Sequence, residues 1–177
     1  VRVERFRRIA GPECQRVYTD SSGNRGMRIR DALESDAEAL ASVTGRPEEV
    51  ARNMIHDRSV RVAVEADGDS GRGGDSDTGS DSGEEEEVVR GFVAFDVRGD
   101  TVHVTDFDGS GSTIERLFEE PRRFARREEM GVEAVVPDDE PTGEILENSG
   151  FDPVGPGPRF EGRRTTRYVI DAGDLDR

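Results

Sequence analysis

The chain has 177 residues, enough for one ordinary domain with a core, and its 40 carboxylates outweigh 25 basic residues, all of them arginine, to give a net charge of −15. This balance excludes the basic face that duplex nucleic acid requires, and it predicts a halophilic protein in a salt-rich cytoplasm, where a short Debye length screens the repulsion between carboxylates. No apolar run approaches the roughly 20 residues that span a membrane. The chain has a single cysteine, Cys14, and two histidines, which excludes an intramolecular disulfide and a thiol-rich zinc site. We therefore expect no metal.

Residues 1–26 differ in composition from the rest of the chain. They are net basic, show little hydrophobic periodicity and end in a turn-rich stretch of serine, glycine and asparagine. We predict a flexible tail here and a single domain over 27–177. Because Met27 opens a regular segment and position 1 is valine, we also hypothesise that the tail comes from a start codon assigned too far upstream.

A short strand and two helices are predicted next. The strand begins at 28–30, and Ser35 with Glu38 three positions later forms a capping box that opens the first helix. A second helix is predicted from about Pro47. The apolar faces expected for these helices consist of Ala37, Leu40 and Ala41 in the first, and Val50, Met54 and Ile55 in the second.

Three strands follow, with an acidic insert between the first two. Residues 60–66 and 88–97 alternate and are rich in β-branched side chains, and 101–107 continue them through a turn at Gly99. The segment 67–87 holds many carboxylates and glycines but no residue able to fill a core, so it cannot repay the entropy of ordering. We predict a disordered hairpin insert there and an antiparallel meander around it.

The last part of the chain alternates helices and strands. A second capping box, Ser112 with Glu115, opens a helix toward Met130 that Pro121 should kink or briefly break and that Gly131 should end. A buried strand at 132–136, a helix at about 142–148 and a closing strand at 163–170 follow. The order predicts an α/β fold: a mixed sheet with helices on both faces.

Three segments, in the right order, resemble the GNAT superfamily of N-acetyltransferases. Residues 115–131 with the strand 132–136 resemble its central helix and buried strand, 145–151 its final helix, and 27–40 its opening strand and helix. The resemblance implies a GNAT-like mixed, mostly antiparallel sheet with one parallel splayed strand pair. It also implies an acyl-CoA-dependent N-acetyltransferase that takes acetyl-CoA as co-substrate and passes the acetyl group to an unidentified amine acceptor by direct attack in a ternary complex. Such a protein would be a monomer or a homodimer.

In that family the pantetheine arm of the cofactor adds to the sheet where two parallel strands splay, and its pyrophosphate rests on amides at the start of the central helix, a natural anion site. The resemblance therefore assigns cofactor binding to Phe107, Gly109, Ser110, Gly111, Ser112 and Thr113. The loop diverges from the family pattern, because Gly109 replaces a glutamine or arginine and two carboxylates stand nearby. Residues 109–113 could equally form no more than a capped loop.

The catalytic positions also diverge from the family. The proton-donating tyrosine of many members aligns with Leu146, which cannot donate a proton. The candidates for a general base are Asp106 and Asp108, with His103 as a further one. Four arginines of the central helix, Arg122, Arg123, Arg126 and Arg127, are expected to pair with glutamates of the same helix rather than to reach the cofactor. The alternative function is therefore a non-catalytic binding or regulatory module on the same fold.

Overall fold

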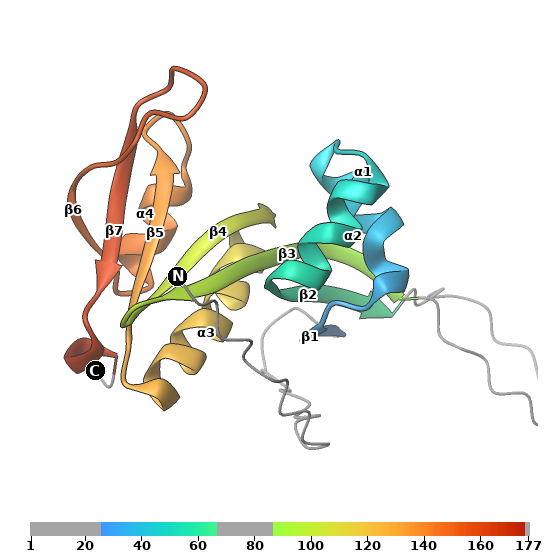
Figure 1. Ribbon diagram of the computed structural model, residues 1–177, viewed down its shortest axis with the longest axis horizontal. Helices are drawn as coiled ribbons and strands as arrows, with labels where there is room; N and C mark the ends of the chain where they lie inside the picture. Colours follow the sequence, from blue (N-terminus) through green and yellow to red (C-terminus); the bar gives the residue numbers. More distant parts are fainter. Residues whose placement is uncertain (1–25, 67–86, 176–177) are drawn as a thin grey trace, which may run out of the picture.

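A computed structural model describes residues 26–66 and 87–175 of the chain. Their strands form one seven-stranded sheet in the order β1-β2-β3-β4-β5-β7-β6 (Figure 1). The strands are β1 (Met27–Asp31), β2 (Ser59–Ala66), β3 (Glu87–Arg98), β4 (Thr101–Gly109), β5 (Gly131–Pro137), β6 (Asp152–Pro156) and β7 (Thr165–Ile170). The helices are α1 (Ala37–Thr44), α2 (Glu48–Asp57), α3 (Gly111–Glu128) and α4 (Thr142–Asn148), with 3₁₀ turns η1 (Glu34–Asp36) and η2 (Ala172–Asp174).

The helices cover both faces of the sheet, as the predicted α/β class requires. In β3, Phe92 and Ala94 pack in the cluster under α1 and α2, whereas Val93 and Phe95 pack in the cluster under α3 and α4. All four side chains are at most 1 % exposed. Successive side chains of a strand point to opposite faces, so this apolar run serves two cores at once.

One strand pair is parallel, and it separates after four residues. β4 pairs with β5 only from Thr101 to Val104, opposite Gly131 to Ala134, and every other pair in the sheet is antiparallel. Directly after Val104, the residue Thr105 is extra in the register with β3, which makes a β-bulge. A bulge bends its strand, and β4 turns away from β5 here (Figure 1). The splayed parallel pair that the family resemblance implies is confirmed.

One predicted helix face and one missing strand need correction. Val50 is 45 % exposed, and the residue of α2 that enters the core is Ala51, one position later. Residues 51, 54 and 55 follow helical spacing better than 50, 54 and 55 do. The edge strand β6 was not predicted, because Pro153, Gly155 and Pro156 are signals of a turn in isolation and are tolerated in a strand only at a sheet edge.

The predicted ends of α3 were also wrong. Its N-cap is Ser110 rather than Ser112, and the left-handed residue after it is Glu129, with φ of 56°, rather than Gly131. Gly131 instead opens β5, where a Cβ atom would lie 3.1 Å from the carbonyl oxygen of Ile170. The helix also runs unbroken through Pro121, which is buried against the sheet. Burial of that face outweighs the loss of one backbone hydrogen bond.

The first capping box is built differently from the prediction. Asp36, not Ser35, accepts a hydrogen bond from the Leu33 amide, at 2.7 Å, and the same carboxylate binds Arg30. Arg30 also donates to Glu87. Glu87 was predicted as the last residue of the insert, but it is the first residue of β3. The predicted tail (1–26) and insert (67–87) lie outside the described residues except for Gly26 and Glu87. Within 26–66 and 87–175, no helix has the length and apolar character needed to span a membrane.

Candidate functional site

The candidate site begins where β4 and β5 part. β4 runs on for five residues beyond Val104, to Gly109, while the residues of β5 after Ala134 pair only with β7. Within the described part of the chain, the edge of β4 that faces this gap has no neighbouring strand. Free strand edges present a row of backbone donors and acceptors, so an extended chain can add to the sheet at this place.

The start of α3 follows directly and supplies an anion site. The Ser110 hydroxyl accepts from the Thr113 amide at 3.3 Å, and the Ser110 carbonyl accepts from the Ile114 amide at 2.8 Å. The amides of Gly111 and Ser112, the first two residues of the helix, have no intrahelical acceptor and lie in exposed residues. They stand at the positive end of the helix dipole, where phosphate groups bind well.

Two glycines hold the helix start against the strand ends. A Cβ atom at Gly91 would lie 2.5 Å from the Asp108 carbonyl oxygen and 2.9 Å from Thr113 Cγ2. Gly109, with φ of 146°, has Thr113 Cγ2 only 3.1 Å from where its Cβ would be. The buried Thr113 side chain therefore fits between β3 and β4 because both lack side chains there. This packing places the free amides of α3 at the end of β4.

The six residues predicted to bind the cofactor differ in what they offer to a ligand. Gly111 and Ser112 offer free amides, whereas Ser110 and Thr113 use their polar groups to cap the helix. Gly109 contributes close packing. Phe107 turns its ring into the core, edge-on against Phe118 at a centroid distance of 5.2 Å, so only its backbone is available at the strand edge.

The candidate bases lie near the gap, but one of them has other partners. One oxygen of Asp106 accepts from the Phe107 amide at 3.1 Å, and the other pairs with Arg46 of the loop between α1 and α2. Asp108 is exposed, and its carboxylate has no partner among the described residues. His103 lies before the splay, with Nδ1 3.3 Å from Glu133 of β5, so it is not grouped with the two aspartates.

The remaining predicted positions are structural. Leu146, which the resemblance aligns with the family tyrosine, is fully buried in the core. In α3, Arg122 and Arg123 pair with glutamates one turn away, as expected, whereas the other two arginines have further contacts. Arg126 donates through Nε to the Leu175 carbonyl at 2.9 Å, and Arg127 stacks over the ring of Phe124 at 5.7 Å.

Tyr168 was not singled out by the sequence. It lies in β7 opposite Ala134, the last residue of β5 that pairs with β4, and its ring belongs to the core. Its hydroxyl faces α4, so that a Cβ atom at Gly143 would be only 2.5 Å away. Burial, followed by the nearby charges of Glu147 and Asp138, raises the pKa of this hydroxyl. The alternation of 165–170 could have predicted its burial, but not its place beside the splay.

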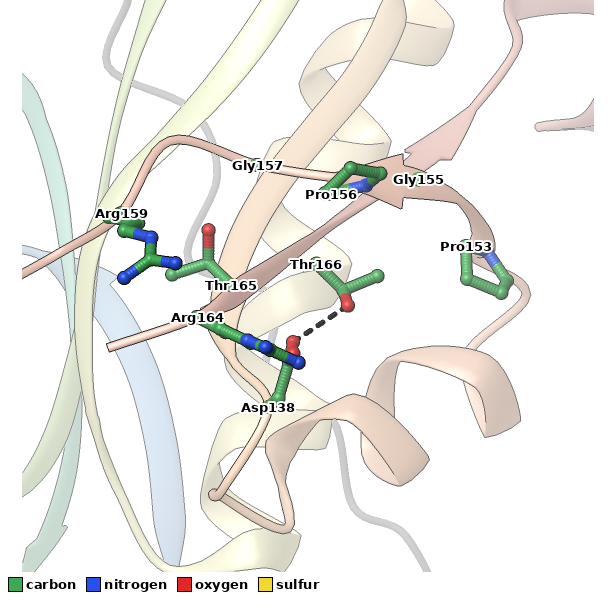
Figure 2. Close-up of a pocket in the computed structure, with 9 residues that line it drawn as sticks. All are labelled: Asp138, Pro153, Gly155, Pro156, Gly157, Arg159, Arg164, Thr165 and Thr166. Atoms are coloured by element: carbon green, nitrogen blue, oxygen red, sulfur yellow. Dashed lines mark hydrogen bonds between the residues drawn. The ribbon is translucent and has the colours of Figure 1, made fainter. Parts of the chain in front are cut away.

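The surface is hollowed at another place. An open groove of about 640 Å³ lies along β6 and the start of β7, and none of the predicted site residues lines it (Figure 2). Asp138, which follows β5, forms one side of the groove and accepts a hydrogen bond from Thr166 at 2.8 Å. In the described ranges, His, Cys, Asp and Glu side chains form no group that could hold a metal ion.

Known structures resemble the whole described domain. A GNAT-family protein from Desulfovibrio desulfuricans matches with a TM-score of 0.59 at 15% identity, over 82% of this chain and 99% of its own. Ribosomal-protein-alanine N-acetyltransferase from Brucella melitensis matches with a TM-score of 0.58 at 14% identity, over 81% and 99%. Spermidine N-acetyltransferase from Vibrio cholerae, solved with CoA and spermine, matches with a TM-score of 0.59 at 11% identity, over 87% and 100%. No protein-family model matches the sequence, and no curated protein does.

The fold is therefore that of the GNAT N-acetyltransferases: a mixed sheet with a splayed parallel pair and a central helix that begins beside the splay. At this level of identity the resemblance establishes the fold alone. The backbone of the site suits a cofactor with a phosphate group and an extended amide arm, since free helix amides and a free strand edge adjoin each other. The first turn of α3, residues 111–114, contains no arginine, so the donors that it presents at this end are backbone amides.

Proposed function

We propose that the protein is an acyl-CoA-dependent N-acetyltransferase that moves an acetyl group to an amine by direct attack in a ternary complex. One observation supports this proposal above the others: the free edge of β4 beyond Val104 leads within a few residues to the free amides at the start of α3. A sheet edge for the pantetheine arm and an anion site for the pyrophosphate are thus continuous. Acetyl-CoA would supply the activated thioester: the amine nitrogen would form the new amide bond, the C–S bond would break, and CoA would leave as a thiolate that takes a proton from solvent.

The protein's own groups would act mainly by positioning. Gly111 and Ser112 would hold the pyrophosphate through their amides, and the edge of β4 would orient the thioester beside the amine. In this structure the Phe107 amide donates to the Asp106 carboxylate. Once that hydrogen bond breaks, the amide could donate to the thioester carbonyl and polarise it. Asp108, which has no competing cation, is the better placed of the two aspartates to take the proton from the attacking amine, directly or through a water.

A non-catalytic binding or regulatory module is the second candidate. Two observations favour it. Leu146, which the resemblance aligns with the family's proton-donating tyrosine, is buried, and the Phe107 amide that would polarise the thioester already donates its hydrogen bond to Asp106. Both candidates use the same fold, and they differ in whether acetyl-CoA binds and reacts. Under either candidate, the lysine-free, acidic composition supports a cytoplasm rich in salt as the protein's location.

Calorimetric titration of acetyl-CoA into the full chain in molar potassium chloride tests the proposal. We expect micromolar binding in the wild type and its loss in Gly111→Asp/Ser112→Asp. Acidic side chains in the first turn stabilise a helix, so this variant should stay folded while repelling the pyrophosphate. The control is Gly173→Asp in η2, where a Cβ atom meets nothing within 4 Å.

The outcomes separate the two candidates. Binding that the α3 variant loses and the control keeps would support a cofactor site and justify a screen of amine acceptors. The absence of heat from a folded wild-type sample would refute the enzymatic proposal and leave the binding module.

A further inference from the structure

The groove along β6 and β7 carries an unusual pair of arginines. Most arginines of the described residues pair with carboxylates, donate to a carbonyl oxygen or stack on a ring. Those whose side chains have no such partner in the described ranges are Arg58, Arg159 and Arg164. Two of them line the groove. In a chain with a net charge of −15, unpaired guanidinium groups gathered at one place call for a physical cause.

A small hairpin brings these two arginines together. Its turn is Glu161 and Gly162, both with positive φ, 49° and 81°, as a two-residue hairpin turn requires. Phe160 and Arg163 exchange backbone hydrogen bonds of 3.2 and 2.8 Å on either side of it. Arg159 and Arg164 are the next residues along the two arms, just outside the isolated bridge between Phe160 and Arg163, and both line the groove. In Figure 2 the two side chains flank Thr165.

Two positive charges that line the same groove repel each other unless an anion compensates them. Arg163, on the same hairpin, shows the usual solution, since it binds Asp139 at 2.6 Å and Glu140 at 2.8 Å. Among the described residues, Asp138 is the only carboxylate lining the groove, and one of its oxygens already accepts from Thr166. Two arginines and one aspartate leave the groove with one net positive charge, which matches one monoanion.

The groove is close enough to the splay to share a ligand with it. Asp138 follows β5 and stands four residues after Ala134, where the pairing of β4 and β5 ends. At about 3.3 Å per strand residue, the separation is about 13 Å. This length corresponds to an extended peptide of about four residues, with its amino group at the splay and an acidic side chain in the groove.

We propose that this groove is the specificity site for an acceptor that carries a carboxylate about three residues from its reacting amine, held by Arg159 and Arg164. The inference rests on the proposed acetyl transfer, because it names the class of acceptor for that reaction. The guanidinium pair would bind the carboxylate through charge-assisted hydrogen bonds. An acidic peptide acceptor is thus favoured over a polyamine, which the two arginines would repel.

Two probe peptides test the inference: Ala-Ala-Ala-Asp and Ala-Ala-Ala-Asn, each with a free amino end and an amidated carboxyl end. Their affinity for the full chain is measured by calorimetry without acetyl-CoA, and their acetylation is measured with it. Exposed charge pairs contribute modestly, so we expect the aspartate peptide to bind about fivefold more tightly. Arg159→Gln/Arg164→Gln should abolish this preference. Arg58→Gln removes the unpaired arginine outside the groove and should preserve it.

The two readouts keep this inference separate from the proposed function. Equal affinity of the wild type for the two peptides, or a preference that survives in Arg159→Gln/Arg164→Gln, would overturn the inference even if both peptides were acetylated. A preference that disappears only in the double variant supports it. If that binding pattern holds while neither peptide is acetylated, the groove stands as a carboxylate site and the catalytic proposal fails.

Discussion

Asp36 joins the first strand to the first helix, and its replacement should destabilise the fold. The residue is 7 % exposed. It accepts hydrogen bonds from Arg30 Nη1 at 2.7 Å, from Arg30 Nη2 at 3.0 Å and from the Leu33 amide at 2.7 Å. In Asp36→Asn the side chain keeps one acceptor oxygen but turns an amino group toward the guanidinium, so donor meets donor. Arg30 retains Glu87 as a second partner, which limits the loss.

We expect Asp36→Asn to lower the free energy of unfolding by about 2 kcal/mol, the scale of a hydrogen-bonded charge that loses its buried partner. Urea unfolding followed by circular dichroism in molar potassium chloride measures the change. The control is Glu34→Gln in the same 3₁₀ turn, whose carboxylate is 63 % exposed and pairs with Arg52 at 3.4 Å. That variant should lie within about 0.5 kcal/mol of the wild type. Equal effects of the two variants would refute the assignment.

The ion pair between Arg30 and Asp36 also predicts that the stability of the fold depends on pH. Burial alone would raise the pKa of Asp36, but the hydrogen bonds from Arg30 and Leu33, with the charge of Arg30, outweigh it and lower the pKa below 3.8. The ionised group therefore contributes its full stability above its unfolded pKa, and the contribution is lost as the pH falls through the folded pKa. The difference between wild type and Asp36→Asn should hold at neutral pH and shrink below about pH 4. A constant difference down to pH 2 would contradict this account.

Three further predictions concern the site and the surface. Gly91→Ala should lower the free energy of unfolding by about 3 kcal/mol, because its Cβ would lie 2.5 Å from a backbone oxygen. The control Gly173→Ala should leave that free energy nearly unchanged, and equal midpoints of urea unfolding for the two variants would contradict this packing. Leu146→Tyr should lower the free energy of unfolding by about 2 kcal/mol, because the side chain lies in a filled core. The variant should not transfer acetyl groups faster than the wild type, and a faster rate would show that the new hydroxyl reaches the site. The melting temperature should rise from dilute buffer to molar potassium chloride as carboxylate repulsion is screened, and a fall would argue against salt adaptation.

Much of the fold was predictable because it depends on interactions between residues near each other in the chain. The helical period of 142–148 predicted α4 with its observed bounds, and the alternation of 60–66 and 88–97 predicted β2 and β3 to within a residue. The order of these elements was enough to predict the mixed sheet. The caps were harder, because Ser110 and Ser112 are both good N-caps and only the packing of Thr113 between two glycines selects the first.

The composition, the element order apart from β6, and the existence of a glycine-rich loop before a long helix were determined by the sequence itself. Only the tertiary structure decided that the parallel pairing ends at Val104, that Arg46 reaches Asp106 across 60 positions, and that Arg159 and Arg164 line one groove with Asp138. The physical reason is the range of the forces involved. Periodicity and capping act within one or two turns, whereas the register of β4 and β5 and the position of a charge depend on packing between distant segments.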